Sequence, residues 1–226
     1  MDTILVFDFG GQYCHLIARR LRDAGVFAEV VPSDYSAAQI EKRGNIKGII
    51  LSGGARSVYE KDAPEYDKKI FDLKIPIFGI CYGHQLLAKV AGGDVKSGKA
   101  GEYGLESISV SKKSGIFSGL SAKENVWMNH KDIVTKLPKG FSVTASSKQC
   151  PIAAYVSSDG QRLGVQFHPE VTHTKAGEKI FKNFVALTKA KRGYTSANLL
   201  KDTIREAKET IGKDNAVIGL SGGVDS

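Results

Sequence analysis

Residues 75–88 read IPIFGICYGHQLLA, an apolar run that ends at a cysteine and continues into a helical pattern. Cys81 stands between Gly79 and Gly83, two positions from each. A strand that turns sharply into a helix favours residues without bulk at these positions, and the turn pushes the central side chain out above the sheet edge. The stretch therefore predicts a nucleophile elbow, although a lone cysteine also fits a small core residue.

Short apolar runs alternate with helical patterns on either side of this stretch. The expected strands are residues 3–7, 27–31, 48–52 and 75–80, and the expected helices are residues 16–21, 37–43, 65–71 and 86–92. From residue 93 to about residue 167 the apolar period shortens toward two, which predicts strands at 105–110, 126–128, 143–145 and 152–156, before a helix over 174–190. The sequence predicts an α/β fold: an open, mostly parallel sheet with flanking helices and a smaller antiparallel β section.

The composition is that of a globular protein, with 226 residues, 42% hydrophobic and 25% charged. The formal net charge of +8 does not by itself indicate a nucleic-acid partner, because the lysines are scattered with acidic residues between them. No apolar run approaches the ~18 residues of a membrane helix, and Asp2 and Asp8 stand where a secretory signal needs basic residues. We expect a cytoplasmic protein with no nucleic-acid and no membrane partner.

The three cysteines are Cys14, Cys81 and Cys150. An odd number without CxxC spacing fits neither a disulfide framework nor a zinc site, and no metal is expected. Because Cys14 and Cys150 lack the flanking glycines of Cys81, we assign them to packing.

One of the five histidines comes with a candidate orienter. His168 and Glu170 are two positions apart in VQFHPE, so if the strand continues both side chains project from the same face. Glu170 would then hold one imidazole nitrogen while the other faces the Cys81 thiol, as in a catalytic triad. Taken alone, the pair also fits a surface histidine with a nearby carboxylate.

Two segments of the sequence are predicted to supply backbone amides that donate to an oxyanion. The Cys81 thiol would lie at a helix N-terminus, which favours the thiolate, and the amide of Tyr82 would point to where an oxyanion forms. Residues 51–54 (LSGG) end another strand of the same sheet, and backbone amides at Gly53 and Gly54 are open to a ligand. A plain turn is the other interpretation of the paired glycines.

These motifs together resemble the class I (triad-type) glutamine amidotransferase family. The residues that carry the resemblance are GICYGHQ at 79–85, LSGG at 51–54 and QFHPE at 166–170. Further matching stretches extend it over nearly the whole chain: FDFGGQY at 7–13, LSGGARSVYEKDAP at 51–64, VWMNHKD at 126–132 and GVQFHPEVTHT at 164–174. The resemblance implies the amidotransferase-like fold over residues 1–191.

The resemblance also implies the chemistry of a glutaminase. Cys81 would attack the side-chain amide of L-glutamine, while the amides of Gly54 and Tyr82 hold the oxyanion. His168, oriented by Glu170, would protonate the departing ammonia and then activate water to release glutamate. The residues that the resemblance assigns to the α-amino and α-carboxylate ends of glutamine are Gln85, Asn129, His130 and Lys131. No cofactor is implied for this domain.

Two residues depart from the family pattern. Ala55 stands where relatives usually carry proline, which loosens the oxyanion loop slightly. Lys131 stands where glycine is more usual. This departure is expected to affect the affinity for glutamine more than the chemical step.

The last residues resemble the start of another domain. Residues 192–197 are polar and turn-like, and residues 192–226 supply a linker, a helix with Leu200 and Ile204 on one stripe, and a strand at 216–220. The final six residues resemble the pyrophosphate loop of N-type ATP pyrophosphatases: Ser221, Gly222, Gly223, Val224, Asp225 and Ser226. The resemblance implies a truncated ATP pyrophosphatase domain as partner, which would use ATP and Mg²⁺ to aminate a nucleotide that this chain alone does not bind.

Three other interpretations remain. An α/β-hydrolase with a cysteine elbow normally places its acid well before its histidine, whereas Glu170 follows His168. A cysteine peptidase or γ-glutamyl hydrolase of related fold would not turn over free glutamine. A catalytically silent regulatory module would show no selective labelling of Cys81 by a glutamine-like electrophile.

Overall fold

The computed structural model describes residues 1–111 and 115–217. The chain divides into two compact units, Met1–Gly193 and Tyr194–Ser226, a division two residues after the boundary expected from the sequence. The second unit contains helix α5 (Ser196–Ile211), which begins at a capping box between Thr195 and Asn198. The strand expected at 216–220 lies mostly outside the described residues, and the expected loop at 221–226 lies entirely outside them.

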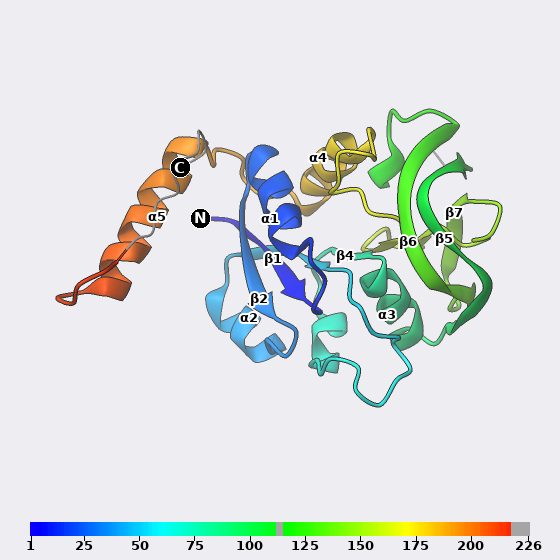
Figure 1. The fold of residues 1–226 in the computed structure, drawn as a ribbon, viewed down its shortest axis with the longest axis horizontal. Helices are drawn as coiled ribbons and strands as arrows, with labels where there is room; N and C mark the ends of the chain where they lie inside the picture. The colour runs from blue at the N-terminus through cyan, green and yellow to red at the C-terminus, as the bar shows by residue number, and fades with distance from the viewer. Residues whose placement is uncertain (112–114, 218–226) are drawn as a thin grey trace. The chain divides into compact units, whose positions relative to one another are not determined.

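Within the described residues, nine strands form one sheet in the first unit, in the order β2-β1-β3-β4-β9-β8-β7-β5-β6 (Figure 1). The strands are β1 (Thr3–Asp8), β2 (Phe27–Pro32), β3 (Ile46–Leu51), β4 (Ile77–Ile80), β5 (Asp94–Val110), β6 (Lys123–Lys136), β7 (Phe141–Ser146), β8 (Ala154–Ser157) and β9 (Arg162–Val165). Neighbours from β2 to β9 in this order are parallel, and the remaining pairs are antiparallel. The predicted fold class is confirmed.

Helices cover both faces of the parallel part of the sheet. Alternate β1 side chains divide between two cores: Ile4 and Val6 pack with α1 (Cys14–Asp23) and α4 (Gly177–Thr188). Leu5 and Phe7 pack on the other face with α2 (Ala37–Arg43), α3 (Tyr82–Val90) and the short 3₁₀ helix η1 (Lys68–Asp72). A second 3₁₀ turn, η2 (Gly115–Phe117), joins the first core. Strands buried on both faces explain the nearly continuous apolar runs of the sequence.

Three elements differ clearly from the sequence prediction. The helix expected at 65–71 is only the five-residue η1, begun by the side chain of Asp67, which accepts a hydrogen bond from the Lys69 amide. Strands β5 and β6 are much longer than predicted, 17 and 14 residues, and pair with each other as a curved ribbon at one end of the sheet (Figure 1). Glycines within β5 interrupt the alternation of polar and apolar residues, so the sequence pattern predicts only the last part of this strand.

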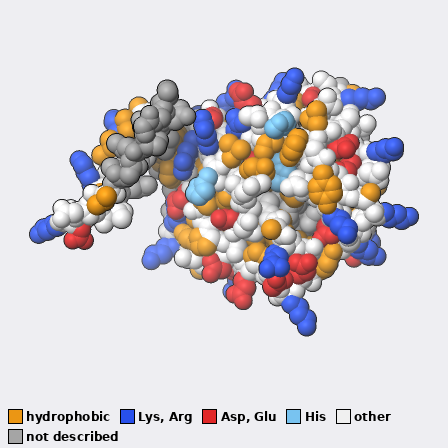
Figure 2. Space-filling model, viewed as in Figure 1, with side chains coloured by type: hydrophobic (Ala, Val, Ile, Leu, Met, Phe, Trp, Pro, Cys, Tyr) orange, Lys and Arg blue, Asp and Glu red, His pale blue; other side chains and the backbone are white. Residues whose placement is uncertain are grey.

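The surface charge is dispersed. Figure 2 shows lysine and arginine side chains spread around the visible face of the first unit, with acidic side chains between them. Among the described residues, no helix combines the length and the apolar character needed to cross a membrane.

The topology gathers four strand ends at one edge. β1, β3, β4 and β9 are consecutive and parallel, so the segments that follow them meet at the carboxyl edge of the sheet. Ligands of open α/β sheets bind at this edge. The segments are residues 9–13 after β1, residues 52–54 after β3, Cys81 after β4 and residues 166–170 after β9.

Candidate active site

Cys81 lies at a sharp bend between β4 and α3. Its backbone has φ 53° and ψ −105°, a left-handed conformation that costs a non-glycine residue of the order of 1–3 kcal/mol. A Cβ at Gly79 would lie 2.3 Å from the carbonyl oxygen of Gly83, and a Cβ at Gly83 would lie 2.2 Å from that of Leu51. Both glycines are therefore required by close backbone contacts, and the geometry is that of the predicted elbow.

His168 and Glu170 are paired although the strand does not continue to them. β9 ends at Val165, and residues 166–170 form bends and a turn, so the expected extended geometry is wrong. The turn at Pro169 nevertheless brings the Glu170 Oε1 atom within 2.6 Å of His168 Nδ1, and both side chains are buried. His168 Nε2 has no hydrogen-bond partner among the described residues, which leaves it for a reacting group.

Neighbouring strands bring the nucleophile candidate and the base candidate together. β4 and β9 pair Ile80 with Val165, and the Cys81 amide donates to the Val165 carbonyl at 2.9 Å. A Cβ built on Gly53 would lie 3.8 Å from Cys81 Cβ and 3.2 Å from His168 Cε1. Cys81 and His168, nearly ninety positions apart in the sequence, thus both lie beside Gly53.

Electrostatics favour a protonated His168. Burial alone would lower the pKa of His168, but Cys81 and Glu170 beside it outweigh burial and raise the pKa to about 11. The imidazole therefore holds its proton at neutral pH and has one to give to a leaving group.

The loop after β3 packs closely on its neighbours. A Cβ at Gly54 would lie 2.7 Å from the Phe9 carbonyl oxygen, and a Cβ at Gly11 would lie 2.5 Å from that of Gly53. The buried Ser52 hydroxyl links the same two segments, because it accepts from the Phe9 amide at 3.1 Å and donates to the Gly53 carbonyl at 2.9 Å. The backbone of this loop is fixed beside the elbow.

Tyr82 is the first residue of α3. The amides of a first helical turn have no partner within the helix, and the helix dipole adds partial positive charge there. Both predicted oxyanion donors, at Gly54 and Tyr82, therefore belong to segments that border Cys81.

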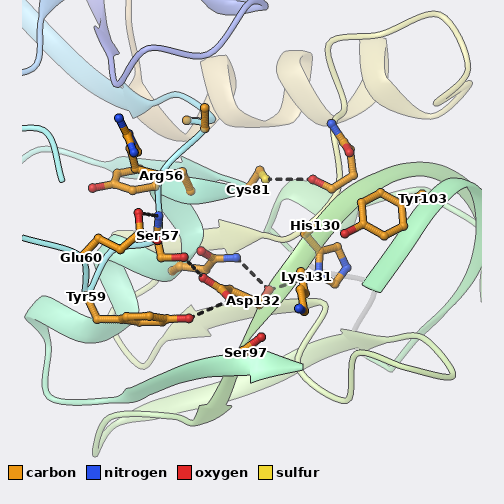
Figure 3. A pocket seen from close by; sticks show the side chains of 15 residues that line it. Arg56, Ser57, Tyr59, Glu60, Cys81, Ser97, Tyr103, His130, Lys131 and Asp132 are labelled. Carbon is orange, nitrogen blue, oxygen red and sulfur yellow. Dashed lines mark hydrogen bonds between the residues drawn. The ribbon is translucent and has the colours of Figure 1, made fainter. Parts of the chain in front are cut away.

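Two cavities meet at Cys81. The first, of about 460 Å³, is bordered by the loop after β3, the start of α3 and β6, and its lining includes Gln85, Asn129, His130 and Lys131 (Figure 3). The second, of about 240 Å³, is bordered by residues 10–13 and contains His168 and Glu170. Both are lined by Gly54, Ala55, Cys81 and Asn129. The candidate base faces only the smaller cavity.

The four predicted glutamine-binding residues all line the larger cavity, but they differ in what is left to bind a ligand. Both ring nitrogens of His130 lie beside acceptors: Nε2 is 3.0 Å from a carboxylate oxygen of Glu102, and Nδ1 is 3.1 Å from the Asp132 carbonyl. Gln85 Nε2 donates to the Asp132 carbonyl at 2.9 Å and to Gln166 Oε1 at 3.1 Å. Lys131 is exposed at the cavity wall.

The other two cysteines are buried in the core. Burial raises the pKa of Cys14 and of Cys150 to about 12 in each case, so both remain thiols. Cys150 lies with Glu102 and His130 in a cluster whose ligand-type atoms are within 4.8 Å of one another. Since Ser147 and His130 already occupy the two Glu102 oxygens, this cluster is a satisfied polar network rather than an open metal site.

Three supporting residues were not foreseen from the sequence. Thr174 donates its hydroxyl to the His168 carbonyl at 2.7 Å and accepts from the Trp127 amide at 2.9 Å. Gln166, fully buried, lies with its Nε2 atom 3.7 Å from the Cys81 sulfur. Asp132 accepts hydrogen bonds from the loop after β3. Single polar residues of this kind leave no periodic signal, and their roles depend on tertiary contacts.

Comparison with known proteins identifies the family. A model described as "Glutamine amidotransferase class-I" matches residues 5–187, and the chain therefore belongs to the class I glutamine amidotransferase family. Two curated relatives are GMP synthases (glutamine-hydrolyzing) from Clostridium perfringens, 42% identical, and Bacillus cytotoxicus, 46% identical. Both alignments cover all 226 residues of this chain but only 44% of the relative.

A solved structure resembles the chain over most of its length. It is that of a protein from Thermoplasma acidophilum described as a candidate GMP synthase subunit, with 34% identity and a TM-score of 0.76. The match covers 89% of this chain and 98% of that protein.

Proposed function

We propose that the chain hydrolyses L-glutamine to glutamate and ammonia through a thioester on Cys81. The observation that carries the proposal is the meeting of a strained cysteine with the buried His168–Glu170 pair at the carboxyl edge of the sheet. The relatives are described as glutamine-hydrolyzing, which supports the substrate.

In the first half of the reaction the Cys81 sulfur attacks the side-chain carbonyl carbon of glutamine. The new oxyanion accepts hydrogen bonds from the amides of Gly54 and Tyr82, in a site whose donors are already fixed. His168 gives its Nε2 proton to the amide nitrogen, the C–N bond breaks, and ammonia leaves a thioester behind.

In the second half His168 is neutral and acts as the base. It takes a proton from water, the resulting hydroxide attacks the thioester carbon, and the C–S bond breaks to release glutamate and the Cys81 thiolate. Glu170 holds Nδ1 throughout, which keeps Nε2 directed at the reacting atoms and stabilises the imidazolium. The reaction regenerates the starting pair.

The two cavities suggest where the parts of glutamine lie. The larger cavity is polar and would hold the amino acid end, with Gln85, Asn129, His130 and Lys131 as binding residues. Because both Nε2 hydrogens of Gln85 are used within the protein, its carbonyl oxygen is the part left to accept from the α-ammonium group. The side chain of His130 is similarly engaged, so its contribution would come from the backbone. Ammonia and water would use the smaller cavity, which His168 lines.

The ammonia has a proposed destination. The chain spans about 44% of the length of its GMP synthase relatives. We infer that a partner ATP pyrophosphatase domain, using ATP and Mg²⁺, takes the ammonia to aminate XMP to GMP. The loop at residues 221–226 lies outside the described residues, so no step is assigned to it. A cytoplasmic location remains a prediction.

The test measures ammonia release from glutamine by the purified chain and labelling of its cysteines by a glutamine-like chloroketone. Cys81→Ala is expected to abolish both, whereas Cys14→Ala and Cys150→Ala remove buried thiols and keep the labelling. Labelling without selectivity for Cys81, or full turnover by Cys81→Ala, contradicts the proposal. Selective labelling of Cys81 with low turnover supports the proposal.

A further inference from the structure

Asp132, on β6, joins two sides of the larger cavity. Its Oδ2 atom accepts a hydrogen bond from the Ser57 hydroxyl, and its Oδ1 atom accepts one from the Tyr59 hydroxyl at 3.0 Å (Figure 3). Ser57 and Tyr59 belong to the loop between β3 and η1, which forms the opposite wall of the cavity. Hydrogen bonds to an ionised carboxylate are among the stronger ones in proteins.

The backbone of Asp132 has further contacts with the same cavity. Its carbonyl accepts from Gln85 Nε2 at 2.9 Å and lies 3.1 Å from His130 Nδ1. The residue thus connects the loop, the helix α3 and the buried His130–Glu102 pair. Figure 3 shows Asp132 below Cys81, with Ser57 and Tyr59 on one side of it and Lys131 and His130 on the other.

The loop has few other anchors beyond its first residues. It carries no helix or strand between Leu51 and Lys68, and Arg56 pairs with Asp62 only through side chains that are both more than half exposed. Val58 is buried, and its carbonyl accepts from Lys89 Nζ at 2.5 Å. The start of the loop is fixed independently, because Gly54 packs against the Phe9 carbonyl. Loss of the Asp132 contacts would therefore loosen Ser57 and Tyr59, on either side of the buried Val58, while the start of the loop at Gly54 stays in place.

We propose that Asp132 is a positioning residue that holds the loop closed over the amino acid end of glutamine. The inference rests on the proposed glutaminase function. Asp132 does not contact the reacting atoms, so its contribution falls on substrate affinity and not on the chemical step. The carboxylate acts through Ser57 and Tyr59, which together use both of its oxygens.

The experiment compares Asp132→Ala with the wild-type chain in ammonia release from glutamine. The KM is expected to rise roughly 10- to 100-fold, as for loss of hydrogen bonds to a charged group, with kcat unchanged. Alkylation of Cys81 by iodoacetamide, which has no amino acid end, is expected to keep its rate, while labelling by the glutamine-like chloroketone slows. Asp62→Ala removes an acid from the same loop and is the matched control, with KM unchanged.

A second set of variants separates the loop contact from direct binding of substrate by Asp132. Ser57→Ala combined with Tyr59→Phe keeps the carboxylate and is expected to reproduce the KM of Asp132→Ala. Adding Asp132→Ala to this double variant should raise KM no further, since all three residues act as a unit. An unchanged KM in the double variant, or additive effects, overturns the inference.

Trypsin gives a readout that does not depend on glutamine turnover. Arg56 and Lys61 are exposed cleavage sites in the loop, and both should be cut faster in Asp132→Ala than in the wild-type chain. If the wild-type chain releases no ammonia, the proposed function fails, and this rate still decides whether Asp132 holds the loop. Equal cleavage rates overturn the inference. Asp132→Asn, which keeps one acceptor, serves if the alanine variant does not fold.

Discussion

Acidification should destabilise the folded chain through His84. This residue of α3 is fully buried, with its ring centroid 4.6 Å from that of Tyr155. Neither ring nitrogen has a hydrogen-bond partner among the described residues. Burial lowers the pKa of His84 from 6.5 to about 3, so the folded protein keeps the ring neutral in a range where the unfolded chain protonates it.

The magnitude follows from proton linkage. Between pH 6.5 and pH 3 the unfolded state binds one more proton at this site, so stability falls as the pH falls. Each pH unit in this window corresponds to about 1.4 kcal/mol, and lowering the pH to 5 therefore costs about 2 kcal/mol. The cost is absent above the unfolded-state pKa of 6.5 and grows as the pH falls from there toward the folded-state pKa of about 3.

The assay is urea unfolding of the wild-type chain and His84→Met at pH 7 and pH 5. The wild-type chain should lose about 2 kcal/mol more than the variant between these values, whatever the variant's own stability at pH 7. His15→Met changes a histidine that is exposed in the folded chain and should leave the wild-type loss unchanged. Equal losses in the wild-type chain and His84→Met would refute the reasoning, because His84 would then carry its proton in both states.

Three further substitutions test the elbow and the base, and a fourth, Gly104→Ala, is a control. Gly83→Ala places a Cβ 2.2 Å from the Leu51 carbonyl oxygen and should lower the free energy of urea unfolding by roughly 3 kcal/mol, whereas Gly104→Ala, with φ 103° and open space around it, should cost about 1 kcal/mol. Glu170→Gln removes the charge beside His168 and should lower kcat for ammonia release by about 10²-fold or more, with its KM little changed. Thr174→Val removes the hydroxyl that holds the His168 carbonyl and should cost about 1–3 kcal/mol in unfolding, together with slower turnover; unaltered stability would show that water replaces the hydroxyl.

The parts of the site that follow from local backbone geometry could be predicted from the sequence. Gly79 marks the elbow through a close contact with Gly83, within one turn of chain around Cys81, whereas the close contact of Gly83 is with Leu51 on the neighbouring strand and depends on the sheet. The pairing of His168 with Glu170 was also foreseen, but for the wrong reason. An extended strand was expected, and the chain instead turns at Pro169.

Other features needed the tertiary structure. His130 was expected at the substrate, yet Glu102, on the neighbouring strand, occupies one of its ring nitrogens. Asp132 gave no signal of its own, since a single acidic residue in a polar stretch fits any solvated strand. Its partners Ser57 and Tyr59 lie more than seventy positions away and meet it only when the sheet is assembled.

The two halves of the sheet carry different parts of the candidate site. Cys81 and His168 follow strands of the parallel half, whereas Asn129 and Asp132 lie on β6, in the long antiparallel ribbon at the far end of the strand order. The ribbon approaches the sulfur through the Asn129 carbonyl, which lies 3.8 Å from Cys81 Sγ. Changes of length or charge in the ribbon would therefore reshape the larger cavity, while the strands that carry Cys81 and His168 stay as they are.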